Sequence, residues 1–298
     1  MLASAAATNV VAQTPRKIAV ATTRVLTILS EPNAIIWLDD LRRGATDETG
    51  KLTIQKVGLG AKKLRVRAIG FAEKTQILSA MARGEIKIVL TKTNDPAELL
   101  FQQAEGLRES GGETTRSQAI ALYRAALQAK PDYFAARIGL ARVLGETGGG
   151  EAALAEIAAA RKIRPADPQA STVEGRIYRS SNDPENAIKS FQRAIREAKN
   201  IQPEAHTGLA LAYEDQDLTE KAITEFKIAI AQLADTEPIV YQLLGAALEK
   251  INRKPEAIVA YEKFLQLAPS PAQASAVRSI VEQLKKQNQS DTLEVLPQ

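Results

Sequence analysis

Hydrophobic residues follow two different periods along this chain of 298 residues. From Val25 to Thr91, short apolar runs are separated by turn residues about every 8–12 positions, a spacing that predicts β-strands in a small sandwich. From about residue 95 onward, apolar residues recur at the spacing of amphipathic helices. The pattern therefore predicts an α+β protein with two domains, a β-rich domain followed by an all-α domain.

The β-rich part contains six expected strands. They cover residues 25–29, 34–38, 52–54, 63–68, 75–78 and 86–90. We expect the first two to be joined by a turn at Glu31-Pro32-Asn33, because Pro and Asn favour turn conformations. We also expect a turn between strands at Gly44 to Lys51.

The helical part contains a repeat of 34–35 residues. Its markers are five alanines, each followed four residues later by a bulky residue: Ala119 and Tyr123, Ala153 and Ile157, Ala187 and Phe191, Ala222 and Phe226, and Ala257 and Tyr261. A small residue lets two helices approach closely, and the bulky residue fills the adjoining gap. One such helical hairpin cannot bury its apolar face alone, so neighbouring hairpins have to stack.

The first helix of each unit also carries a pattern: a bulky residue, then a Leu followed by a small residue, then a second bulky residue. The clearest example is Tyr241, Leu244, Gly245 and Leu248. Together the two patterns resemble the tetratricopeptide repeat family. The resemblance implies an all-α solenoid with five units over residues 95–270, a capping helix at 271–287 and a flexible tail at 288–298. It also implies a protein-protein interaction scaffold that is not an enzyme.

Residues 24–93 resemble the PEGA and carboxypeptidase regulatory-like β-sandwich families. Three segments carry the likeness: 30–34, 44–50 and 68–71. The chain departs from the PEGA pattern at Asn33, where that pattern has glycine. The resemblance implies an accessory module, common on exported or envelope proteins, without chemistry of its own.

The repeat resemblance also implies a binding groove on the concave wall, formed by first-helix positions that flank the small residue. By register these positions are Ile138, Arg142, Thr172, Arg176, Arg179, Thr207, Leu211, Glu214, Asp215, Gln242 and Glu249, preceded in unit one by Glu105 and Arg108. Arg142 and Arg176 are one repeat apart, so we expect them on one wall, where they would capture an acidic segment. The groove is then basic in units two and three and acidic in units four and five. The alternative is that these charges only keep a polar wall soluble.

Charge divides the chain in the same place as the hydrophobic pattern. Residues 1–94 hold fifteen Lys and Arg against seven Asp and Glu, whereas the remainder is net acidic. A basic stripe at Lys62, Lys63, Arg65 and Arg67 is a candidate contact for an anionic membrane or wall surface. The alternative is that these side chains form an ordinary solvent-exposed face of a strand. We do not expect nucleic acid as a partner.

The sequence gives little support for a catalytic or a metal-binding function. The chain has no cysteine and one histidine, which removes thiolate sites and multi-histidine sites. His206 occupies a packing position of a repeat, and the acidic Gly44–Lys51 segment does not match a phosphate-binding loop. We therefore expect no cofactor, no metal and no catalytic residue.

The first 23 residues form a leader. Its small residues and Val10-x-Ala12 suit signal-peptidase cleavage, although a basic start is missing. Two interpretations fit: the end of a signal peptide, or a disordered alanine-rich leader. The sandwich resemblance favours a periplasmic or exported protein, with a cytoplasmic location as the alternative.

Two functions follow from these expectations. The leading hypothesis is a scaffold that binds an extended segment of a partner protein in the concave groove. The alternative is a cell-envelope adaptor whose basic sandwich contacts an anionic surface while the repeats mediate assembly.

Overall fold

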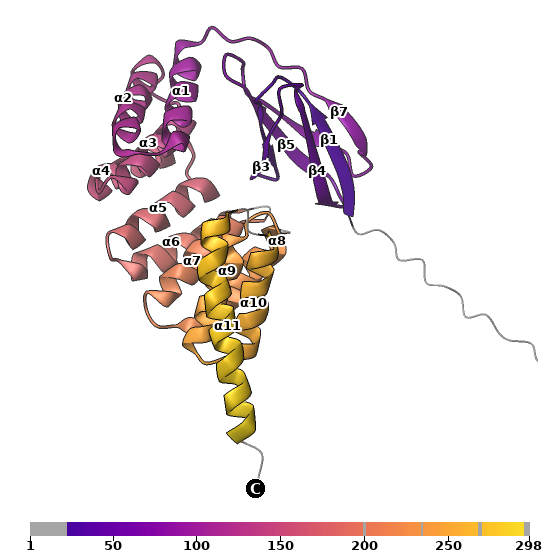
Figure 1. Cartoon of the computed structure of the whole chain (residues 1–298). Coiled ribbons are helices and arrows are strands. Elements are labelled where there is room, and N and C mark those ends of the chain that lie inside the picture. Colours follow the sequence, from indigo (N-terminus) through magenta and orange to yellow (C-terminus); the bar gives the residue numbers. More distant parts are fainter. Residues whose placement is uncertain (1–22, 199–200, 234, 268–269, 295–298) are drawn as a thin grey trace, which may run out of the picture.

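The computed structural model describes residues 23–198, 201–233, 235–267 and 270–294. Within these ranges, seven strands precede eleven helices (Figure 1). The predicted leader lies outside the described residues except for Thr23. The predicted fold class, a small β-sandwich followed by an all-α solenoid, is confirmed.

The sandwich consists of two sheets. Its strands are β1 (Thr23–Leu29), β2 (Ile35–Leu38), β3 (Leu41–Ala45), β4 (Lys51–Gly58), β5 (Lys62–Arg67), β6 (Lys74–Leu78) and β7 (Gly84–Lys87). One sheet has the order β4-β1-β7 and the other β3-β2-β5-β6. Alternate residues of both sheets, among them Leu26, Ile36 and Leu64, form one buried cluster. The two sheets share this cluster, which explains why apolar residues recur at every second position of the strands.

The turn after β1 shows why these residues form it. Asn33 has a positive φ of 57°, a conformation that Asn tolerates better than most residues. Thr46 donates a hydrogen bond from its hydroxyl to the Glu31 carbonyl at 2.6 Å. Gly50 closes the same corner, where a Cβ would lie 2.1 Å from the Ser30 carbonyl oxygen.

The sequence pattern did not reveal β3. Its five residues, Leu41 to Ala45, contain two arginines and a glycine, so no alternation of apolar and polar residues marks them. The strand exists because it pairs antiparallel with β2 across a two-residue turn. Both turn residues, Asp39 and Asp40, have positive φ (54° and 64°), as tight hairpin turns require.

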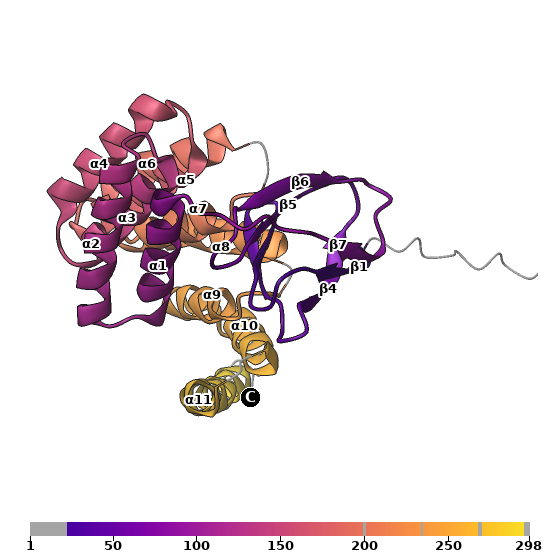
Figure 2. The ribbon, with the colours of Figure 1, turned by 90° about the horizontal axis from the view of Figure 1, so that it is seen from above.

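The helices form successive antiparallel pairs that stack into a curved array (Figures 1 and 2). They are α1 (Pro96–Ser110), α2 (Glu113–Ala129), α3 (Phe134–Glu146), α4 (Gly150–Ile163), α5 (Pro168–Ser180), α6 (Pro184–Glu197), α7 (Pro203–Glu214), α8 (Thr219–Leu233), α9 (Ile239–Lys250), α10 (Lys254–Leu267) and α11 (Pro271–Glu294). The five repeat alanines and the bulky residues four positions later are all buried. The repeat pattern therefore coincides with the contacts between paired helices.

Local sequence defines where several helices begin. The Asp167 carboxylate accepts hydrogen bonds from the amides of Gln169 and Ala170, and Pro168 is the first helical residue of α5. Asp183 and Pro184 repeat the arrangement at α6. An aspartate cap satisfies amides that have no partner within the helix, and proline at the first position loses no bond.

Helix α11 is longer than expected. The predicted cap ends at residue 287, but the helix continues to Glu294 and includes most of the segment predicted to be a flexible tail. No glycine or proline interrupts residues 272–294, so no residue in this stretch ends the helix. None of the helices in the described ranges is long and apolar enough to cross a membrane.

The sandwich lies against the array (Figure 2). At α1, the Gly70 amide donates to the Gln102 side-chain oxygen at 2.9 Å, and the Gln102 amide nitrogen donates to the Phe71 carbonyl at 2.8 Å. At the other end of the interface, Lys56 pairs with Asp235 at 3.5 Å. The sandwich thus contacts both the first repeat and the segment between the fourth and fifth.

We predict that residues 95–298 fold without the sandwich but with reduced stability. Leu41 of β3 is buried in a cluster with residues of α8 and α9, including Leu233 and Val240. Losing roughly 2 kcal/mol of burial should lower the melting temperature by about 4–8 °C. Circular dichroism of the truncated and full-length chains tests this. A truncated chain without helical signal would show that the array cannot fold alone.

Candidate functional site: the concave face of the array

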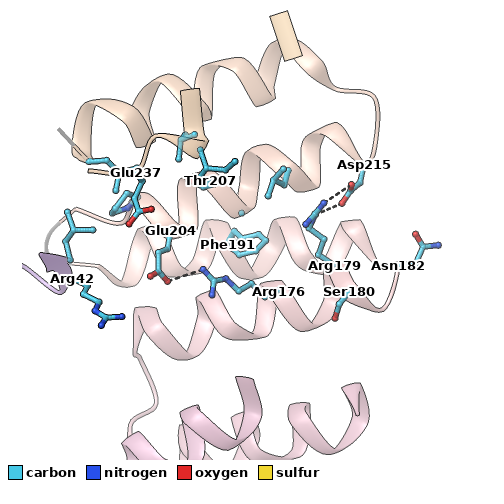
Figure 3. A pocket seen from close by; sticks show the side chains of 17 residues that line it. Arg42, Arg176, Arg179, Ser180, Asn182, Phe191, Glu204, Thr207, Asp215 and Glu237 are labelled. Atoms are coloured by element: carbon cyan, nitrogen blue, oxygen red, sulfur yellow. Dashed lines mark hydrogen bonds and ion pairs between the residues drawn. The ribbon is translucent and has the colours of Figure 1, made fainter. Parts of the chain in front are cut away.

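A pocket of about 820 Å³ opens on the concave face of the third, fourth and fifth repeats (Figure 3). Helices α5, α7 and α9 contribute most of its wall. Its apolar lining residues are Leu41, Phe191, Pro203, Leu211, Leu233, Ile239 and Val240. Pockets of this size and character are typical sites for apolar groups with a few polar contacts around them.

The floor of the pocket is set by close helix packing. The Phe191 ring of α6 is fully buried and touches Gly208 of α7, where an added Cβ would lie 2.3 Å from the ring. Gly175 of α5 is similar, with its virtual Cβ 2.8 Å from the same ring. These two glycines let α5 and α7 approach the ring.

The rim consists of ion pairs between neighbouring repeats. Arg176 donates to Glu204 at 3.3 Å, and Arg179 forms two bonds with Asp215 at 2.7 and 3.3 Å (Figure 3). The arginines of the third repeat are therefore neutralised by acids that belong to the fourth. The predicted division into a basic half and an acidic half is absent here, because the opposite charges meet.

Glu237 supplies a further acid at the pocket. Burial raises the pKa of its carboxyl, and the nearby Glu204 raises it further, with Arg42 acting in the opposite direction. Arg42 comes from β3 of the sandwich and pairs with Glu109 of α1 at 3.2 Å. One wall of the pocket is thus provided by the sandwich.

A second, more polar cavity of about 460 Å³ lies between the sandwich and the array. Trp37, Asp39, Asp40, Lys63 and Arg65 line it from the sandwich; Arg142, Arg164, Asp167, Thr172 and Glu204 line it from the array. Leu41, Pro203 and Glu204 line both cavities, so the two adjoin.

The structure distributes the predicted groove residues unevenly. Arg176, Arg179, Thr207, Leu211 and Asp215 line the larger pocket, and Arg142 and Thr172 line the interdomain cavity. Arg142 and Arg176 also meet at a small cavity of about 150 Å³. The remaining predicted positions, Ile138, Glu214, Gln242 and Glu249, line none of these three cavities.

Contacts within the array account for three of these four positions. Ile138 is buried in the core of the first two repeats. Glu249 accepts a hydrogen bond from the Tyr261 hydroxyl at 2.9 Å, and Glu214 lies 3.8 Å from Lys250. His206 is buried with its Nδ1 2.6 Å from Glu225, consistent with its predicted packing role.

The predicted basic stripe on β5 is not an open cationic surface. Lys62 pairs with Asp39 at 2.8 Å and Lys63 with Asp40 at 2.9 Å. Arg65 lies 4.2 Å above the Trp37 ring, and the buried Arg67 pairs with Glu73 at 3.0 Å and with Glu105 at 3.4 Å. These partners come from β2, the β2–β3 turn, the segment before β6 and α1, so the sequence of β5 alone could not reveal them.

Among the sandwich residues at the site, Lys63 and Arg65 belong to the basic stripe seen in the sequence, but no sequence pattern indicated Leu41, Arg42 or Trp37. Leu41, Arg42 and Trp37 reach it only because β2 and β3 dock on the array. Glu204 and Glu237 lie near the starts of α7 and α9, and no sequence motif marked either position. Among the described residues, no group of His, Asp or Glu is arranged to hold a metal ion.

Comparisons with known proteins agree with the helical architecture. Three models of the tetratricopeptide repeat match residues 115–177, 172–238 and 239–271, which together span just over half of the chain. A comparison with curated proteins found no match. These repeat matches fall outside residues 24–93, whose resemblance to PEGA and carboxypeptidase regulatory-like domains stays a prediction.

Solved structures share the fold of the array at low sequence identity. TTC0263, a thermophilic TPR protein of Thermus thermophilus, is 20% identical with a TM-score of 0.53; the alignment covers 63% of this chain and 98% of that one. PilF of Pseudomonas aeruginosa is 16% identical (66% and 87% covered, TM-score 0.55). PilW, a widely conserved type IV pilus biogenesis factor, is 15% identical (67% and 95% covered, TM-score 0.54). The family itself is shown by the three repeat models over residues 115–271, which place the helical array of this chain in the tetratricopeptide repeat family.

Proposed function

We propose that this protein is a non-enzymatic scaffold that holds an extended segment of another protein in its concave pocket. Tetratricopeptide repeat proteins are generally protein-interaction scaffolds. The observation that carries the proposal is the 820 Å³ pocket with its apolar floor. Because Arg176 and Arg179 are already paired, the pocket favours apolar side chains of the partner over acidic ones.

A substitution at Leu211 tests this proposal. Leu211 is half-buried and lines the pocket, so Leu211→Glu would place a carboxylate where apolar side chains are to bind. The full-length chain first identifies its partner by affinity capture and mass spectrometry, and titration calorimetry then gives the dissociation constant. We expect Leu211→Glu to weaken binding at least tenfold, since anchor contacts carry about 2 kcal/mol or more.

Val259→Glu is the matched control, because Val259 is an exposed apolar residue of α10 outside the pocket. It should leave the dissociation constant unchanged. Equal binding by the wild type and Leu211→Glu, at similar melting temperatures, would contradict a role for the pocket.

We also propose that the protein acts in the cell envelope after export. This proposal rests on the small residues and Val10-x-Ala12 of the leader and on the resemblance of residues 24–93 to envelope modules. An adaptor role based on the basic stripe has weaker support, because its four side chains are paired. Fractionation of cells that produce the full-length chain distinguishes a periplasmic from a cytoplasmic location.

A further inference from the structure

The concave face already holds an apolar side chain from the chain's own sandwich. Leu41 follows the β2–β3 turn, is 9% exposed and belongs to the buried cluster of the fourth and fifth repeats. Together with Asp39 and Asp40 it forms the sequence Asp-Asp-Leu, here named the β2–β3 tip. The tip stands where the larger pocket and the interdomain cavity adjoin.

Arg142 of α3 faces the same cavity without a partner. It is half-buried, and among the described residues its guanidinium forms no ion pair or hydrogen bond; its Nε is buried without an acceptor. Glu204, a carboxylate that lines the same cavity, is bonded to Arg176. A buried guanidinium without a carboxylate is energetically unfavourable, so this position lacks an anionic group.

The tip does not supply that group. Asp39 accepts from Lys62 Nζ at 2.8 Å and from the Lys63 amide at 2.9 Å, and Asp40 pairs with Lys63 Nζ. Both carboxylates are therefore held by the sandwich itself. The tip fills an apolar position but leaves Arg142 unsatisfied.

We propose that the groove binds a partner segment in which an aliphatic residue stands next to carboxylates, and that this segment takes the place of the β2–β3 tip. The inference rests on the proposed function and names the partner's chemistry. The aliphatic residue replaces Leu41, and a carboxylate reaches Arg142. A planar guanidinium binds a carboxylate through two parallel hydrogen bonds, which gives the incoming segment an interaction that the tip does not make.

The attachment of the tip is weak enough for exchange. Beyond Leu41, the β2–β3 hairpin is joined to the array by the Arg42–Glu109 pair, in which the arginine side chain is 49% exposed. Exposed ion pairs of this kind contribute little to stability.

A synthetic peptide tests the exchange on the full-length chain. The probe is a fluorescein-labelled peptide with Leu-Asp-Asp-Leu in a Gly-Ser background, and fluorescence anisotropy gives its dissociation constant. We expect Arg142→Gln to weaken binding by about tenfold or more, because a charge-assisted bond is lost. We expect Leu41→Ser to strengthen binding by about threefold or more, because the competing side chain is removed.

Trp37 reports displacement of the tip independently. It is the only tryptophan of the chain, it is half-buried, and it lines the interdomain cavity beside the tip. Peptide binding should change its emission in the wild type. In a second peptide, Asn replaces both Asp residues. The wild type should bind this peptide no more tightly than the Arg142→Gln variant does.

The controls separate this inference from the proposed function. Arg278→Gln removes an exposed arginine of α11 and should leave peptide binding unchanged. Equal binding by the wild type and Arg142→Gln, weaker binding by Leu41→Ser, or no binding of the peptide at all would overturn the inference. The scaffold proposal is tested separately, by the binding of the natural partner to the wild type and to Leu211→Glu.

Discussion

Replacing Phe191 with alanine is expected to lower the free energy of unfolding of the array by about 3–5 kcal/mol, the usual cost of emptying a buried aromatic site. The ring is fully buried and packs with Ala187, Ala194 and Leu209. It joins α6 to both α5 and α7, so its loss leaves a cavity at a repeat interface. Urea denaturation followed by circular dichroism measures the effect.

The two glycines that contact the ring provide the control. Gly208→Ala places a methyl group 2.3 Å from the Phe191 ring and should itself destabilise the wild type. In the Phe191→Ala background that clash is absent, so the same change should cost less. A loss below about 1 kcal/mol for Phe191→Ala, or additive effects of the two substitutions, would show that the packing differs from the structure.

The sequence predicted this packing because the contact is periodic. Ala187 and Phe191 are on consecutive turns of one helix, and equivalent pairs recur every 34–35 residues. Each pair contacts only its own and the adjacent hairpin, so a local pattern contains all the information required. The same reasoning selected Thr207, Leu211 and Asp215, which line the larger pocket.

The contacts between the sandwich and the array could not be predicted in this way. Leu41 and Val240 belong to one buried cluster although about 200 residues separate them, and no repeated sequence pattern links the two positions. β3 itself was missed because its arginines and glycine do not alternate with apolar residues. The side of the groove formed by the sandwich therefore became visible only in three dimensions.

Equivalent positions in the repeats also differ in electrostatic environment. Arg142 and Arg176 have the same register, yet Arg176 pairs with Glu204 whereas Arg142 has no partner among the described residues. The difference arises from the residues around each arginine, which do not repeat. Register predicts where a side chain points, but the neighbouring sequence decides whether it is free to bind.

Glu105 of α1 is the central acid of the interface between the sandwich and the first repeat. It lies 3.4 Å from Arg67 of β5 and 3.2 Å from Arg108, and it accepts a hydrogen bond from the Tyr123 hydroxyl. Burial alone would raise the pKa of its carboxyl. The two arginines and the Tyr123 hydroxyl outweigh burial and bring the pKa to about 2, below its usual 4.5.

This lowered pKa makes stability depend on pH in a defined direction. Because the folded-state pKa lies below the unfolded value, the stabilisation is fully present above about pH 4.5 and is lost as the pH falls towards 2. We expect Glu105→Gln to lower the free energy of unfolding at pH 7 by about 3 kcal/mol, since the buried Arg67 loses a partner. The variant should also lose stability less steeply between pH 5 and pH 2 than the wild type.

Glu109→Gln is the control. Glu109 lies one turn further along α1 and pairs with the half-exposed Arg42, so this substitution should lower the free energy of unfolding by less than about 1 kcal/mol. Denaturation curves at several pH values measure both variants, and parallel pH profiles for the wild type and Glu105→Gln would contradict the role of this carboxylate.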